Sequence, residues 1–220
     1  EDERKYQDIV LSVNRDITIE GTISKETFKS ILKWKDKRER VEKAVRWASY
    51  DSIYKPRFQL IISDSVSDNH KLLILIWDED KLKSKLPVVP RVLDGISGRA
   101  AGFGVPVAST VLHFIFPTRF PIVDIRTAEV LYFTSKIKSA DKGDYRIYDQ
   151  FRSGLLKVAT TSRYSLHAID RALFGYHKYT LQLEMDKIFK KRYIATQGHE
   201  PSFSLTLEMP WKLRQSIIDE

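Results

Sequence analysis

The sequence AGFGVPVASTVLHFIF at residues 101–116, followed by PIVDIRT at residues 121–127, carries most of the information in this chain. A Gly-x-Gly turn at residues 102–104 stands directly before an apolar run that suits a helix. Pro117 ends that run, and after a short loop Asp124 stands between apolar residues at the start of the next helical pattern. We therefore expect a tight turn, an apolar helix, a loop and a second helix that Asp124 opens.

Helical periodicity continues over most of the 220 residues. Ser24 is a typical N-cap before a helix with Phe28, Ile31 and Leu32 on one face, and Ser165 precedes a similar pattern. Pro56 interrupts the pattern between two such segments. We expect helices over residues 24–32, 41–48, 68–76, 93–100, 105–116, 127–134, 148–158 and 165–176.

Strand signals are weak by comparison. Residues 16–19 alternate and residues 58–62 are apolar and partly β-branched, but both segments also suit a helix. Residues 202–207 alternate weakly, within a segment from about 196 to 220 that we expect to be irregular. The predicted fold is mainly α, with room for a minor β element. We expect residues 1–220 to form one domain that can divide into two helical lobes.

The composition excludes several classes of chemistry. The chain has no cysteine, which excludes disulfides, cysteine nucleophiles, thiolate zinc sites and iron–sulfur clusters. Its five histidines show no metal-ligand spacing, and His113 within the apolar helix fits a hydrogen-bonded core residue. We therefore expect neither a metal nor another cofactor. The net charge of +8 favours a polyanionic partner, and the apolar runs are too short to span a bilayer, so we expect a soluble cytoplasmic protein without a membrane partner.

The Gly-x-Gly turn suits phosphate binding. Glycines let the backbone approach a phosphate, and the free amides at the start of the following helix can donate to its oxygens. Gly102, Gly104, Val105 and Val107 would contribute these backbone contacts, and Phe103 would fill the space between the two helices. The alternative is an ordinary turn between packed helices.

Asp124 also has two readings. Aspartate is a preferred N-cap, so capping of the next helix alone could explain it. A carboxylate in this position can also stabilise positive charge that develops on a nearby sugar, and can orient or deprotonate an attacking water.

Taken together, the residues resemble the helix-hairpin-helix DNA glycosylase superfamily. In that superfamily a Gly-Val-Gly-x-Lys-x-Ala hairpin is followed at a fixed distance by Val-Asp at a helix start. Residues 102–108 are similar to the hairpin, and Asp124 lies eighteen residues after Pro106, as in the family. The resemblance covers about residues 93–131. It implies two helical lobes with the hairpin beside a cleft, and a catalytic Asp124 that faces an extruded base.

Two departures from the family pattern bear on the chemistry. Pro106 occupies the place where bifunctional members have a nucleophilic lysine, and proline has no amine and no backbone N–H. Arg126 lies within the pair that replaces the family's Thr-His after the aspartate. The resemblance therefore implies the monofunctional branch, in which water is the nucleophile, without an iron–sulfur cluster.

Further DNA contacts can come from the basic stretch around residues 33–46. Lys35 and Arg38 are candidate DNA-binding residues, and Trp34 is a candidate base-pocket or wedge residue. Residues 28–38 also resemble the N-terminal part of uncharacterised bacterial proteins with this kind of hairpin. The alternative is a solvated helix surface with internal ion pairs. Arg126 is a second base-pocket candidate, with an ion pair to Asp124 or Glu129 as its alternative.

The function that we expect is hydrolysis of the N-glycosidic bond of a modified or damaged base. The partner would be double-stranded DNA with an extruded base, bound by a monomer in association with the nucleoid. Repair and attack on hypermodified phage bases both remain open as biological settings. The alternative function is a non-catalytic DNA-binding protein that uses the hairpin as a phosphate clamp.

Overall fold

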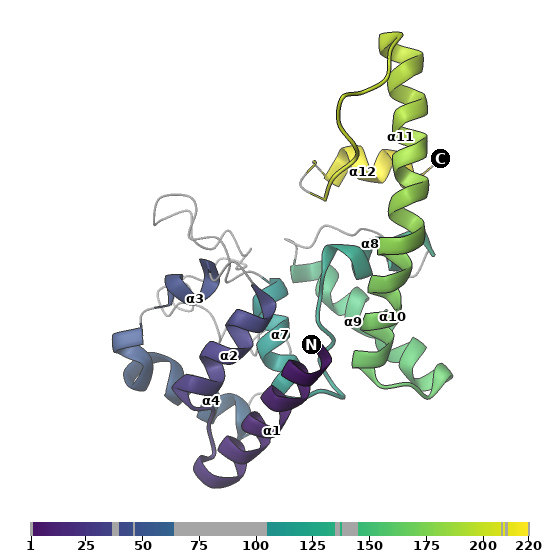
Figure 1. The fold of residues 1–220 in the computed structure, drawn as a ribbon. Coiled ribbons are helices and arrows are strands. Elements are labelled where there is room, and N and C mark those ends of the chain that lie inside the picture. Colours follow the sequence, from purple (N-terminus) through teal and green to yellow (C-terminus); the bar gives the residue numbers. More distant parts are fainter. Residues whose placement is uncertain are drawn as a thin grey trace. The chain divides into compact units, whose positions relative to one another are not determined.

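The structure, a computed structural model, is mainly helical (Figure 1), as the sequence predicts. It describes residues 2–36, 40–45, 47–63, 105–134, 137, 145–207, 209 and 211–219, and these residues contain no strand. The helices predicted over residues 68–76 and 93–100, and the hairpin residues Gly102, Phe103 and Gly104, lie outside the described residues. The chain divides into two compact units, Glu1–Ile122 with Gly143–Tyr145, and Val123–Lys142 with Arg146–Glu220.

The first unit is built on three helices that contact one another. These are α1 (Asp2–Glu20), α2 (Lys25–Lys35) and α7 (Val105–Ile115). The N-cap of α2 is the predicted Ser24, whose hydroxyl accepts the Thr27 amide at 3.2 Å, and the buried face of the helix includes the predicted Phe28. The possible strand at residues 16–19 is part of α1, where Asp16 is the buried residue and Ile19 is exposed.

Shorter helical segments complete the first unit. After α3 (Arg40–Ala44), a 3₁₀ turn (Trp47–Ser49) and a π turn (Tyr50–Tyr54) lead into α4 (Lys55–Ile62). The helix expected over residues 41–48 is thus shorter than predicted. The apolar residues 58–62 are helical, and Pro56 lies in the first turn of α4, where proline is common.

An aromatic cluster fills the space between these segments. Phe28 lies 5.7 Å from Trp47, 5.5 Å from Tyr54 and 5.0 Å from Phe58, measured between ring centroids. Phe28 and Phe58 are almost fully buried. Edge-to-face and tilted ring pairs of this kind stabilise a core beyond the area they bury. The cluster explains how a segment of short helical turns packs without a long helix.

The second unit consists of α8 (Ile125–Phe133), α9 (Tyr145–Ser162), α10 (Leu166–Tyr176), the π turn η3 (His177–Leu181), α11 (Gln182–Gln197) and α12 (Trp211–Ile218). Ser165 caps α10 through the Ala168 amide, as predicted. Through η3, α10 continues into α11 as one long rod (Figure 1). One core cluster of this unit consists of Val130, Leu181, Met185, Phe189, Leu205 and Ile217.

The C-terminal segment corrects one prediction. We expected residues 196–220 to be irregular, but α11 continues to Gln197 and α12 is a helix. Gly198 ends α11 with a φ of 75°, a left-handed conformation that glycine adopts without strain. The residues described between the two helices, including 202–207, form no strand. Among the described residues, no helix has the length and apolar character needed to cross a membrane.

Candidate functional site

The helix that follows the Gly-x-Gly sequence of residues 102–104 begins where the sequence predicts. α7 starts at Val105, and Pro106 lies in its first turn. The Pro106 carbonyl accepts hydrogen bonds from the hydroxyls of Ser109, at 3.1 Å, and Thr110, at 2.7 Å. The side chains of Val105 and Val107 are buried, so these residues can offer a ligand only their backbone amides. The glycines that would complete the phosphate site, and Arg38, lie outside the described residues.

His113 of α7 is a core residue that holds the loop leading toward Asp124. Its Nδ1 lies 2.8 Å from the Phe120 carbonyl, and its Nε2 lies 2.9 Å from the Tyr6 hydroxyl. Because a carbonyl only accepts, Nδ1 carries the proton and Nε2 accepts from the tyrosine. The prediction of a satisfied core histidine is therefore confirmed.

Trp34 and Lys35 lie near the end of α2, in the same unit as α7. The Trp34 ring is half-buried and packs 5.9 Å from Tyr6 and 5.4 Å from Phe114, measured between centroids. These contacts hold the ring against α1 and α7. A role for Trp34 in a base pocket or as a wedge stays a prediction. The side chain of Lys35 is half-buried in the last turn of α2.

Asp124 is the N-cap of α8. Its Oδ1 accepts the backbone N–H of Arg126 at 3.0 Å, and the hydroxyl of Thr127 accepts the Asp124 N–H at 3.3 Å, which together form a capping box. The side chain is half-exposed. Asp124 therefore caps α8, as one of its two interpretations predicts. The cap holds the carboxylate at the positive end of the helix dipole.

Arg126 makes neither of the ion pairs considered as its alternatives. Its guanidinium carbon lies 4.7 Å from the centroid of the Phe174 ring, on α10, in a cation–π contact. Glu129, the other acidic residue of α8, is bound instead by Arg214 and His177. The cationic group of Arg126 is therefore held beside the start of α8 by an aromatic ring.

A fully buried ionic cluster, which sequence reasoning missed, joins three helical segments of the second unit. Arg214 of α12 donates to Glu129 of α8 from Nε at 2.5 Å and from Nη2 at 2.6 Å. Nε2 of His177, in η3, lies 2.6 Å from the second carboxylate oxygen. Arg214 also donates to the carbonyl of Thr206 and the side chain of Gln182. The cluster fixes α12 to the rest of the unit.

The electrostatics of this cluster follow from its geometry. Burial raises the pKa of Glu129, but the hydrogen bonds from Arg214 and His177 outweigh that effect and leave the pKa below its usual range. An ionised carboxylate only accepts, so His177 donates from Nε2. Its Nδ1 is buried without a hydrogen-bond partner among the described residues. All three side chains are fully buried, so the cluster can position helices but cannot touch a substrate.

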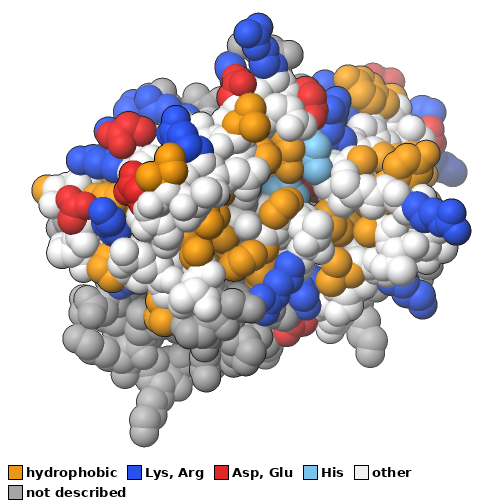
Figure 2. All heavy atoms as spheres, turned by 90° about the horizontal axis from the view of Figure 1, so that it is seen from below, with side chains coloured by type: hydrophobic (Ala, Val, Ile, Leu, Met, Phe, Trp, Pro, Cys, Tyr) orange, Lys and Arg blue, Asp and Glu red, His pale blue; other side chains and the backbone are white. Residues whose placement is uncertain are grey.

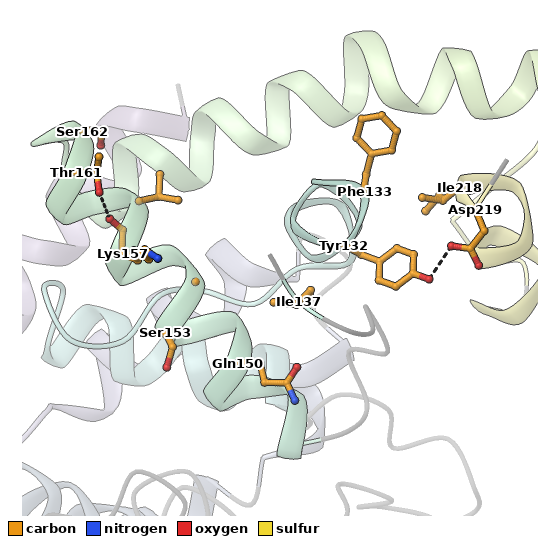
Figure 3. A pocket seen from close by; sticks show the side chains of 12 residues that line it. Tyr132, Phe133, Ile137, Gln150, Ser153, Lys157, Thr161, Ser162, Ile218 and Asp219 are labelled. Carbon is orange, nitrogen blue, oxygen red and sulfur yellow. Dashed lines mark hydrogen bonds between the residues drawn. The ribbon is translucent and has the colours of Figure 1, made fainter. Parts of the chain in front are cut away.

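An open groove lies at the opposite end of α8 from Asp124. Its volume is about 1240 Å³, and Figure 3 shows its walls on α8, α9 and α12. The Tyr132 hydroxyl donates to Asp219 at 2.7 Å, and this hydrogen bond raises the pKa of Tyr132. Tyr132 is eight residues from Asp124, about 12 Å along a helix. The groove is lined by Tyr132, Phe133, Ile137, Gln150, Ser153, Gly154, Lys157, Val158, Thr161, Ser162, Ile218 and Asp219.

The groove is therefore not the base pocket expected beside Asp124. The predicted cleft between two lobes and the predicted hairpin involve both units and residues outside the described ones, so both stay predictions. Within the described ranges, no group of histidine, aspartate and glutamate side chains is arranged to hold a metal ion. Comparison of the chain with protein-family models, curated proteins and solved structures found no match.

Proposed function

We propose that this chain is a monofunctional DNA glycosylase that hydrolyses the N-glycosidic bond of a modified or damaged base. The observation that carries the proposal is the half-exposed carboxylate of Asp124, fixed at the N-terminus of α8 by its capping box. The apolar helix α7, which begins directly after the Gly-x-Gly sequence, supports it. The proposal implies action on DNA in association with the nucleoid.

The reaction follows from what a fixed carboxylate can do. As the bond between the base and C1′ breaks, positive charge develops on the sugar, and the negative Asp124 stabilises it. The base leaves with the electrons of the broken bond and takes up a proton from solvent. A water oxygen bonds to C1′, and the proton that it loses passes to Asp124 or to solvent. The products are the free base and an abasic site. The amides at the start of α8 favour the charged carboxylate through the helix dipole.

A second function is a DNA-binding protein without catalysis, and one observation favours it. The Asp124 carboxylate already accepts the Arg126 amide, so capping gives the residue a structural role that needs no chemistry. In that case the backbone amides of the turn and of α7 would act as a phosphate clamp.

Asp124→Asn separates the two functions. Asparagine caps a helix about as well as aspartate, so the variant keeps the fold and loses only the charge. We expect it to bind DNA normally and to excise bases about a hundred- to a thousandfold more slowly. The measurement is single-turnover excision from duplexes with alkylated, oxidised or hypermodified bases, followed by alkaline cleavage of abasic sites.

Ser165→Asn is the matched control, because it exchanges one cap for another in the same unit, at α10. It should excise at the wild-type rate. If Asp124→Asn is equally active, Asp124 has no catalytic role. If the wild-type protein binds DNA but excises none of the bases, the clamp is the better account.

A further inference from the structure

One side of α10 and η3 carries rings and cations that the chemistry at Asp124 does not use. Arg126 lies over the Phe174 ring, and Nζ of Lys178 lies 4.9 Å from the centroid of the Tyr179 ring. Phe174 and Lys178 are four residues apart on consecutive turns, so they share one side of the helix. We name Arg126, Phe174, Lys178 and Tyr179 the aromatic–cationic row.

Both rings of the row are open to solvent. Phe174 is 37% exposed and Tyr179 is 68% exposed, so neither ring is buried in the core. Exposed aromatic faces beside cations are suited to a partner with flat rings of its own. Figure 2 shows one face of the protein, on which basic, acidic and hydrophobic side chains are interspersed.

The positive charge of the row is not neutralised within the described part of the chain. Neither Arg126 nor Lys178 forms an ion pair with a described residue. Among the carboxylates of this unit, Asp124 caps α8, Glu129 binds Arg214, Glu184 binds Lys187, and Asp186 binds Lys190. The row therefore offers two cations to an anionic partner.

We propose that the aromatic–cationic row binds an unpaired strand of DNA, with bases stacked on Phe174 and Tyr179 and phosphates beside Arg126 and Lys178. Stacking platforms combined with cations are how proteins bind single strands without reading their sequence. The identity of the partner as DNA rests on the proposed function. Extrusion of a base disrupts pairing locally, and the row begins two residues after Asp124, where such an unpaired strand would lie.

The stacking part is tested with Tyr179→Ala. Its matched control is Tyr164→Ala, because Tyr164 is also 68% exposed and belongs to the same unit. Binding of fluorescent oligothymidine, and of a duplex with a central unpaired bubble, is measured by anisotropy. We expect Tyr179→Ala to weaken binding roughly five- to a hundredfold, as loss of one base–aromatic stack does, and the control to leave it unchanged.

The electrostatic part is tested with Lys178→Glu. Its control is Lys191→Glu, the same charge change at an exposed lysine of α11. For oligothymidine, the slope of log affinity against log salt should become shallower by about 0.7 for the phosphate contact that is lost. Tyr179→Ala should leave this slope unchanged, because stacking releases no counterions.

The outcomes separate this proposal from the glycosylase. If the wild type excises a base, but both test variants bind DNA like their controls, the proposed role of the row is wrong and the proposed glycosylase function stands. If no base is excised, but both variants bind oligothymidine more weakly than their controls, the proposed glycosylase function is wrong and the proposed role of the row stands. The proposal for the row is also wrong if the wild type does not bind oligothymidine. Binding to vesicles that contain phosphatidylserine is measured in parallel. If the two variants lose only this binding, the partner is a lipid surface and the proposal is wrong.

Discussion

At Glu129 a single carboxylate is enclosed between the guanidinium of Arg214 and the imidazole of His177, with no exposed surface. A buried ion pair is not by itself a large source of stability, because both charges have lost their hydration. Its effect is instead to hold α12 in place, because Arg214 of α12 must stay beside the negative charge of Glu129. Removing one partner would leave the other buried and uncompensated, which typically costs about 3–5 kcal/mol.

This arrangement predicts a dependence of stability on pH. Burial raises the pKa of Glu129, but its hydrogen bonds lower the pKa by more than burial raises it. The folded-state pKa therefore lies below the ordinary value of 4.5. The stability that the carboxylate contributes is therefore fully present above pH 4.5 and is lost as the pH falls through the folded-state pKa. The double variant Glu129→Leu/Arg214→Met lacks this contribution and keeps the other carboxylates.

We expect the free energy of unfolding of the wild type, relative to that of the double variant, to decrease as the pH falls below 4.5. Urea unfolding at several pH values, followed by circular dichroism, measures both proteins. Parallel pH profiles for the two would show that Glu129 does not titrate on unfolding.

At the scale of the element, Pro106 is the second residue of α7 and lies where bifunctional members of the superfamily that the chain resembles have a lysine. Pro106 cannot form a covalent adduct with the sugar, and its place in the first turn costs no intrahelical hydrogen bond. If the chain excises bases, we expect intact abasic sites that break only after alkali or heat. Borohydride added during the reaction should trap no protein–DNA adduct on a denaturing gel.

Pro106→Lys is the informative companion variant, since it places an amine at the position that corresponds, in the resemblance, to the nucleophilic lysine. A trapped adduct with this variant alone would support the superfamily alignment. A strong adduct with the wild type would instead identify another amine as the nucleophile.

The elements that the sequence did not predict have physical reasons. α11 continues α10 through a π turn, and only Met185 and Phe189 of its side chains are buried, so its periodicity is faint. α12 is short, and Pro210 before it resembles a breaker, although proline also suits a helix start. Residues 16–19 show a strand-like alternation, but they form the last part of α1, a helix of 19 residues whose pattern was too weak to recognise there.

At the scale of the whole molecule, the net charge of +8 predicts how binding responds to salt. Affinity for duplex DNA should fall by roughly 0.9 log units per tenfold increase in salt for each phosphate that the protein neutralises. Gly104→Asp should weaken this binding strongly, because it adds a side chain and a like charge where the backbone would approach a phosphate.

The control for this variant is Ala195→Asp, which places the same side chain on the exposed surface of α11. Binding is measured by anisotropy at several salt concentrations, with circular dichroism as a check on folding. If the folded Gly104→Asp protein binds like this control, the turn is only structural and the superfamily resemblance loses its main support.

The sequence by itself determined the helical class of this protein and several helix starts. Ser24, Asp124 and Ser165 cap helices as predicted, and Phe28 lies on the buried face of α2. These features could be predicted because a cap and an amphipathic stripe depend on residues within about four positions of each other.

Only the tertiary structure decided what surrounds the candidate site. Glu129 meets residues 48 and 85 positions away, and Arg126 meets Phe174 instead of either acidic residue of its own helix. No local pattern encodes such pairs, since a buried charge is stable only when its partner arrives with the packing of another helix. The helix caps could therefore be predicted from neighbouring residues. The cluster that fixes α12 and the aromatic–cationic row could not, because their members lie far apart in the sequence.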